Sequence, residues 1–238
     1  IDVDSSFYVP RFGIKVGLSE SVNCLATYSE PYGADAGYGL NNIYSPSAVE
    51  FSLDTQDYGL TCSYSIDMGE TEYGASSLRL IAGGSYMEVE GFLSRQSFLF
   101  GGTVTNPLNN AVIPVNPTTG VGTFNISDDT TGWRAGVAYE IPSIALNATI
   151  LYSSKYDLNL TGVQDTTGFT TLPGPFATTT PIVLQGAEIP QALDIKLQTG
   201  INETTLAFLN MRWQDWSVLG VLPVVSLNTG NPTGSTLD

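Results

Sequence analysis

Hydrophobic and polar residues alternate along most of the chain, as expected of β-strands with one apolar face. The clearest case is 144–161, where Ile150 and Tyr152 are among the apolar side chains at even positions, and Asn147 and Lys155 among the mostly polar ones at odd positions. These 18 residues would span roughly 60 Å at about 3.3 Å each, whereas a soluble strand usually has ~5–6 residues. We therefore expect an all-β protein with long strands.

The same alternation recurs in seven other segments. They are 11–18, 22–28, 58–67, 76–88, 133–140, 192–201 and 205–214. Connections between these eight predicted strands alternate in length. Short turns are expected near 18–21, 67–75, 141–143 and 202–204, and long loops over 29–56, 89–131 and 162–190, with a tail from 218. Short turns at one end and long loops at the other are typical of a transmembrane antiparallel β-barrel, which is the predicted fold.

The amino-acid composition limits the classes of function that the chain can have. Only 13% of residues are charged, against ~25% in an ordinary soluble domain. A net charge of −15 with eight basic residues argues against a nucleic-acid partner, because binding phosphates requires lysine and arginine. The chain has no histidine, which excludes a Ser-His catalytic pair, so we expect no enzyme activity. No cofactor and no metal site are expected either.

Most basic residues share the polar face of the predicted strands, which would line the lumen. We expect Arg79, Arg134 and Arg212 to form ion pairs there with carboxylates. The candidate carboxylates are Asp67, Glu140 and Asp194.

The two cysteines, Cys24 and Cys62, share the outward parity of neighbouring strands. A disulfide between them is compatible with this placement but not required by it. The pattern favours a role as small lipid-facing residues.

Three stretches of the sequence resemble the FadL/TodX family of outer-membrane transporters for long-chain fatty acids and hydrocarbons. They are Gly132-Trp-Arg-Ala-Gly-Val-Ala-Tyr-Glu-Ile-Pro142 with the following strand to Gly162, Ile189-Pro-Gln-Ala-Leu193, and Met211-Arg-Trp-Gln-Asp-Trp-Ser217. The family fold is a barrel of about fourteen strands plugged by an N-terminal hatch. The resemblance implies that residues 1–238 are about eight strands of such a barrel, without the hatch and the C-terminal strands. An independent eight-stranded barrel is the alternative.

The resemblance also implies that an apolar ligand is captured at extracellular loops, bound in the lumen and released sideways. Apolar clusters on two long loops are candidate ligand-binding residues, although packing of loop on loop would produce the same pattern. They are Phe92, Leu93, Phe98 and Phe100 on one loop, and Phe169, Leu172 and Phe176 on the other. Arg95 is the candidate partner for a fatty-acid carboxylate. The family's basic residue soon after the tryptophan motif is missing, which also leaves room for an uncharged hydrocarbon.

Sideways release needs a break in the strand ladder. Pro31 has no N–H to donate and Gly33 permits unusual backbone angles, so this stretch predicts a kink that opens the wall, or simply the end of a strand. The expected location is the bacterial outer membrane, in contact with its lipid and lipopolysaccharide. A hydrophilic diffusion porin and a soluble β-sandwich adhesin or lectin-like module are the alternatives.

Overall fold

The structure, a computed structural model, describes residues 8–40, 43, 48–99, 102–105, 112–115, 118–168, 178–218, 222–227, 230 and 232–237. In these ranges it contains seventeen strands and two short 3-10 helices, η1 (Pro142–Ile144) and η3 (Trp216–Val218). The strands are β1 (Arg11–Gly17), β2 (Val22–Ser29), β3 (Ala34–Gly37), β4 (Glu50–Thr71), β5 (Gly74–Leu99), β6 (Gly102–Thr105), β7 (Val112–Val115), β8 (Thr118–Ile141), β9 (Leu146–Ser153), β10 (Tyr156–Leu158), β11 (Thr161–Asp165), β12 (Thr179–Leu184), β13 (Ala187–Ile189), β14 (Ala192–Asn202), β15 (Thr205–Gln214), β16 (Leu222–Ser226) and β17 (Pro232–Leu237). No helix among the described residues has the length and hydropathy needed to cross a membrane.

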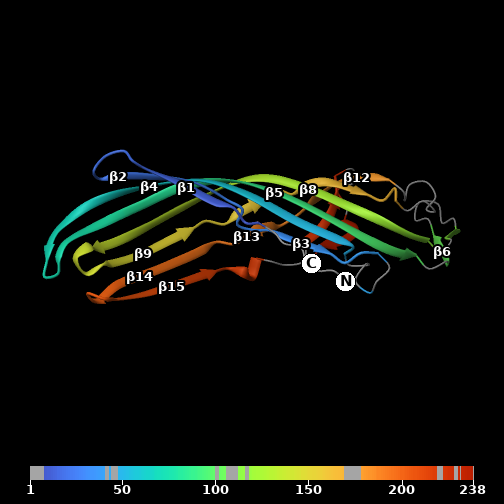
Figure 1. The fold of residues 1–238 in the computed structure, drawn as a ribbon. Helices are drawn as coiled ribbons and strands as arrows, with labels where there is room; N and C mark the ends of the chain where they lie inside the picture. The colour runs from blue at the N-terminus through green and yellow to red at the C-terminus, as the bar shows by residue number, and fades with distance from the viewer. Residues whose placement is uncertain are drawn as a thin grey trace.

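Eight strands form an antiparallel meander in the order β1-β2-β4-β5-β8-β9-β14-β15. Each corresponds to one of the eight strands predicted from the alternation. Their tight hairpin turns gather at one end of the molecule, and the longer connections lie at the other (Figure 1). The predicted all-β antiparallel fold is therefore confirmed.

The meander is a curved sheet. The Nε2 atom of Gln214, at the end of the last strand, donates a hydrogen bond of 3.5 Å to the hydroxyl of Tyr32, which follows the second strand. A flat sheet would hold these strands roughly 30 Å apart at about 4.8 Å per strand. Among the described residues, the outer edges of β1 and β15 have no partner strand, so the curved sheet is an open part of a barrel.

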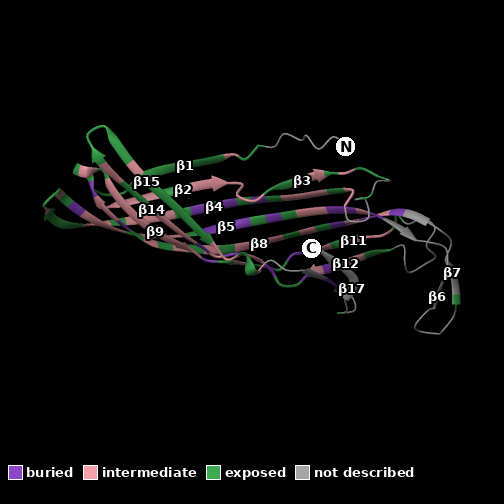
Figure 2. Cartoon of the chain, turned by 90° about the horizontal axis from the view of Figure 1, so that it is seen from below, coloured by how far each residue is buried: buried purple, intermediate pink, exposed green. Residues whose placement is uncertain are grey.

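One face of the meander, here called the outer face, carries a band of apolar side chains that no second sheet covers. One hydrogen-bonded row contains Val16, Cys24, Cys62, Ala82, Ala135, Tyr152, Leu193 and Trp213. Leu60 and Trp133 are 57% and 55% exposed on the same face. A soluble sandwich would bury this band against a second sheet, whereas Figure 2 shows mostly exposed and half-buried residues along these strands, with buried residues on β4 and β5.

The apolar band has the height of a membrane. On β4 it runs from Tyr58 to Ile66, which is nine residues, and a transmembrane β-strand needs ~9–11. At one border stand four aromatic residues in adjacent strands. Phe12 stacks on Tyr28 with ring centroids 5.0 Å apart, and Tyr58 and Tyr86 continue the row at 5.3 and 6.4 Å. Such a girdle is typical of the membrane interface.

Three strands continue far beyond this girdle, and here the prediction of a loop over 89–131 is wrong. β5 and β8 stay paired as far as Leu99 and Thr118. The alternation reverses at the girdle: Met87 and Val89 are buried on the inner face, whereas Glu88 is exposed on the outer face. The ladder therefore persists while the hydrophobic pattern changes sides.

Segments predicted as one strand, a loop and a tail contribute further short elements. The predicted strand 144–161 is divided into η1, β9, β10 and the start of β11. The predicted loop 162–190 contributes β12 and β13, and the predicted tail contributes β16 and β17. The sheet branches at β8, from which β11, β12, β16 and β17 continue as a second arm.

Cys24 and Cys62 form a disulfide. They are register partners on β2 and β4, with Cα atoms 4.0 Å apart. The cysteines keep the outward parity expected of lipid-facing residues, and the disulfide that the sequence left open cross-links two neighbouring strands of the wall.

Candidate functional site

An apolar cluster fills the inner face of the extended strands. β4, β5 and β8 supply one side of it, and β10, β12, β13 and β16 supply the other. Its buried members are Met87, Val89, Leu93, Phe124, Leu158, Leu160, Ile182, Leu184, Ala187 and Val224. Because one side comes from inward positions of the long strands β5 and β8, the cluster lies inside the curved sheet and excludes water there.

A polar network lies directly beside the cluster, on the next inward positions of the same strands. The hydroxyls of Tyr156 and Ser85 share a hydrogen bond of 2.5 Å, and the Tyr156 hydroxyl also donates to Asp57 Oδ1 at 3.4 Å. Arg134 Nη2 is 3.8 Å from Asp57 Oδ2. The inner face thus changes from apolar to polar within one or two residues along β4 and β5.

Further ion pairs line the polar part of the inner face. Arg79 pairs with Glu140 at 2.7 Å and Arg212 with Asp194 at 3.8 Å, as predicted from the sequence. The prediction for Arg134 is wrong in its partner, because Asp57 takes that role.

Past the end of β9, Lys155 bridges two other carboxylates. Its ammonium binds Asp157 at 2.7 Å and Glu188 at 3.0 Å. The hydrogen bond to Asp157, and to a smaller extent the one to Glu188, raises the pKa of Lys155 above its ordinary value.

The wall is interrupted next to the apolar cluster. The β2–β4 ladder ends at Ser29 and the β3–β4 ladder starts again at Ala34. In between, the buried Thr55 of β4 replaces the missing ladder bonds with its side chain. The Thr55 hydroxyl accepts a hydrogen bond from the Tyr32 N–H at 2.9 Å and donates one to the Tyr32 carbonyl at 2.5 Å. Tyr32 itself packs against the apolar cluster.

Comparison with solved structures identifies the architecture. The crystal structure of a Pseudomonas aeruginosa FadL homologue matches 96% of this chain with a TM-score of 0.74 and 16% sequence identity. The chain has a FadL-like fold. It spans about half of the matched chain, 52%. No protein-family model and no curated protein sequence matches it.

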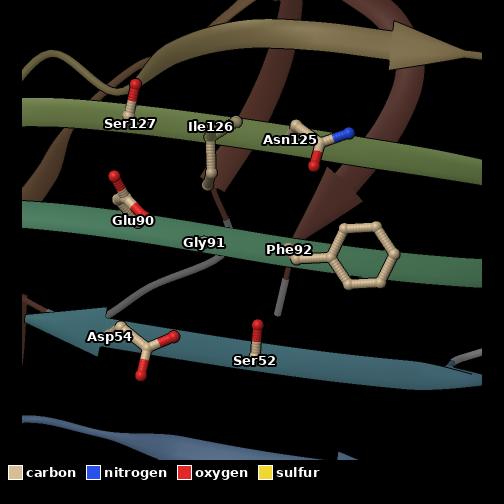
Figure 3. A pocket seen from close by; sticks show the side chains of 8 residues that line it. All are labelled: Ser52, Asp54, Glu90, Gly91, Phe92, Asn125, Ile126 and Ser127. Atoms are coloured by element: carbon tan, nitrogen blue, oxygen red, sulfur yellow. The ribbon is translucent and has the colours of Figure 1, made fainter.

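The residues predicted to bind ligand lie on both faces of the sheet in this fold. Leu93 belongs to the apolar cluster, and the guanidinium of Arg95 lies over the Phe124 ring, 5.5 Å from its centroid. Phe92 instead takes the outer face of β5. It lines a groove of about 290 Å³ across β4, β5 and β8, beside Asn125 and close to Glu90 (Figure 3).

Other predicted residues cannot be placed in the site. The backbone of Phe98 belongs to β5, but its side chain is outside the described residues. Phe100, Phe169, Leu172 and Phe176 lie outside them entirely. Pro31 and Gly33 fall in the interruption between β2 and β3, and a role in ligand exit stays a prediction.

Sequence reasoning missed most of the residues on the inner side of this candidate site. Met87, Val89 and Phe124 were assigned to strand ends or to a loop, yet they alternate with polar residues as inward side chains. That alternation was a usable signal. Thr55 carried no signal, because its importance arises only from the interruption opposite it.

Proposed function

We propose that this chain is part of an outer-membrane transporter for hydrophobic molecules, and that it is not an enzyme. One observation carries the proposal: the interruption of the wall at 30–33 lies against an enclosed apolar cluster. Tyr32 belongs to both features, since its backbone occupies the interruption and its ring packs on the cluster. An apolar molecule inside the sheet would therefore have a short path to the surrounding lipid.

The arrangement of the inner face suggests how a ligand is directed. The apolar cluster favours a hydrophobic chain by removing its surface from water. Beyond the cluster lies the polar network, which consists of Asp57, Ser85, Arg134 and Tyr156. If an apolar chain entered this network, its buried charged groups would lose their hydrogen-bond partners, which costs free energy. Exit through the wall therefore costs less than passage along the lumen.

The ligand is a long-chain fatty acid or an uncharged hydrocarbon. Arg95, on the inner face of β5, is the proposed contact for a carboxylate, and its neighbour Phe124 would contact the adjacent methylene groups. The predicted Phe98, Phe100, Phe169, Leu172 and Phe176 are proposed to capture the ligand from outside, and Leu93, in the apolar cluster, to bind it inside. Phe92 would serve only in surface capture, because it faces away from the cluster.

The exposed apolar band supports a place in the outer membrane, with lipid and lipopolysaccharide around it. The open outer edges of β1 and β15 support the proposal that residues 1–238 are a partial barrel that further strands and a hatch complete. Unpaired edges cannot remain in the hydrocarbon region, because their backbone groups would lack hydrogen bonds.

Uptake into proteoliposomes by the complete protein tests the proposal. Ala34 and Leu53 are register partners at the far side of the interruption, so the A34C/L53C pair should lock β3 onto β4 when oxidised. We expect oxidation to reduce uptake of a fluorescent fatty acid at least tenfold and reduction to restore it. The matched pair S63C/I81C links β4 to β5 where the ladder is continuous and should leave uptake unchanged. Equal uptake by locked and unlocked protein, or an open ion-conducting pore in planar bilayers, would contradict the proposal.

A further inference from the structure

The wall contains a second interruption, on the other flank of the β4-β5-β8 panel. The β8–β9 ladder ends with Arg134 opposite Ser153, and the β8–β11 ladder begins with Ser127 opposite Thr161. The Ser154 N–H still donates to the Trp133 carbonyl at 2.8 Å. From there, no ladder pair joins residues 128–132 to residues 155–160, all of which the structure describes.

Side chains hold this second interruption closed. Thr130 Oγ1 donates to the Asp157 carbonyl at 3.0 Å, and the Asn159 N–H donates to Asp128 Oδ2 at 2.6 Å. These contacts repeat the arrangement at the first interruption, where Thr55 replaces the ladder. Side-chain hydrogen bonds can be released by rotation about side-chain torsions, whereas a ladder bond breaks only if the backbone moves.

The side chain of Tyr156 covers the second interruption on its inner side. The Tyr156 ring packs on the backbone of Gly132, so closely that a Cβ at Gly132 would lie 2.5 Å from Tyr156 Cε1. Its hydroxyl is anchored to Ser85 on β5 at 2.5 Å. Leu158, two residues after Tyr156, belongs to the apolar cluster, and Trp133, which follows Gly132, is exposed on the outer face. The girdle residue Tyr86 is the register partner of Thr131, so the interruption lies at the border of the apolar outer band, with the Tyr156 ring between it and the apolar interior.

We propose that residues 128–132 and 155–160 form a second lateral portal, closed by Tyr156, through which an apolar chain passes between the membrane and the inner cluster. The portal takes hydrocarbon or acyl chains, because Leu158 and Leu160 lie behind it and Trp133 beside it. This inference rests on the proposed transport function for its purpose, but it concerns a different part of the wall from the interruption at 30–33.

Thiol labelling from the bilayer tests the portal. The native cysteines are joined in a disulfide, so an introduced cysteine is the only free thiol among the 238 residues. Leu158→Cys places a thiol behind the portal. Ala138→Cys is the matched control, because Ala138 is equally internal and has ladder partners on both sides, Arg79 and Thr149. A long-chain alkyl maleimide dissolved in the bilayer should react at least ten times faster with L158C in the complete protein than with A138C.

Removing the ring provides a second measurement. Tyr156→Ala in the L158C background should raise the labelling rate several-fold further. If the L158C protein does not fold, Leu160→Cys takes its place in both measurements. Equal labelling of L158C and A138C, or faster labelling of L158C by a water-soluble maleimide than by the alkyl reagent, would overturn the portal. Labelling does not depend on transport. Rapid labelling without uptake of fatty acid would support the portal and refute the proposed function. Uptake without labelling would support the proposed function and refute the portal.

Discussion

Replacing Thr55 by valine should loosen the interruption at 30–33 without changing the shape of the side chain. The hydroxyl of Thr55 serves the N–H and the carbonyl of Tyr32 at 2.9 and 2.5 Å. Thr55 is 3% exposed, so water cannot readily take its place. Leaving buried backbone groups unsatisfied costs about 1–3 kcal/mol. A loss of about 2 kcal/mol corresponds to roughly 25-fold easier local opening, since 1.4 kcal/mol is a factor of ten.

Hydrogen exchange at the Tyr32 amide measures this opening directly. The T55V protein in lipid nanodiscs should exchange roughly 25-fold faster at Tyr32, with the rates at β4–β5 ladder amides unchanged. Thr61→Val is the control, because Thr61 lies on the same strand and the same inner face where the β2–β4 ladder is continuous. Unaltered exchange at Tyr32 in T55V, or an equal increase in T61V, would refute the role given to the Thr55 hydroxyl.

Two further predictions concern the wall itself. Leu60→Arg should destabilise the membrane-inserted protein by about 1–3 kcal/mol, because Leu60 lies between the centre of the band and its Tyr58 border, and a cation facing lipid costs less toward the interface than at the midplane. Thr61→Arg on the inner face should cost far less, and urea titrations of folding into lipid vesicles compare the two. Replacing Cys24 and Cys62 together by alanine should lower stability by about 2–4 kcal/mol, and a reducing agent should lower the wild type to the level of this variant. Unfolding curves that coincide for wild type and variant would show that the cross-link contributes nothing.

The membrane-spanning part of the fold could be predicted because it obeys one rule. Within the apolar band every second residue faces outward, so segments such as 58–67 and 205–214 stand out as strands in the correct order. Predicting a strand by this rule assumes that its apolar side always faces lipid. Beyond Tyr86 the apolar residues turn to the inner face. The assumption therefore predicts a loop where the strand in fact continues.

The two interruptions of the wall differ in how far sequence reveals them. Pro31 removes a ladder donor and Gly33 relaxes the backbone, so the first interruption has a local signal. The second has none, because Ser154 and Lys155 occupy ordinary strand positions in the alternation. It arises because the neighbouring strand has one residue more than β8 between the two ladders, 154–160 against 128–133. Such an offset becomes visible only once the register is known.

We infer that the apolar outer face of the meander contacts lipid, while the opposite face lines an interior. Nitroxide labels on Leu60 and Thr61, adjacent residues of β4, test it most directly by their collision rates with oxygen, which concentrates in lipid, and with a water-soluble nickel complex. We expect a label at 60 to meet oxygen far more often than nickel in the complete protein in bilayers, and a label at 61 not to. Greater access of nickel than of oxygen at position 60, or burial of that label from both, would contradict it.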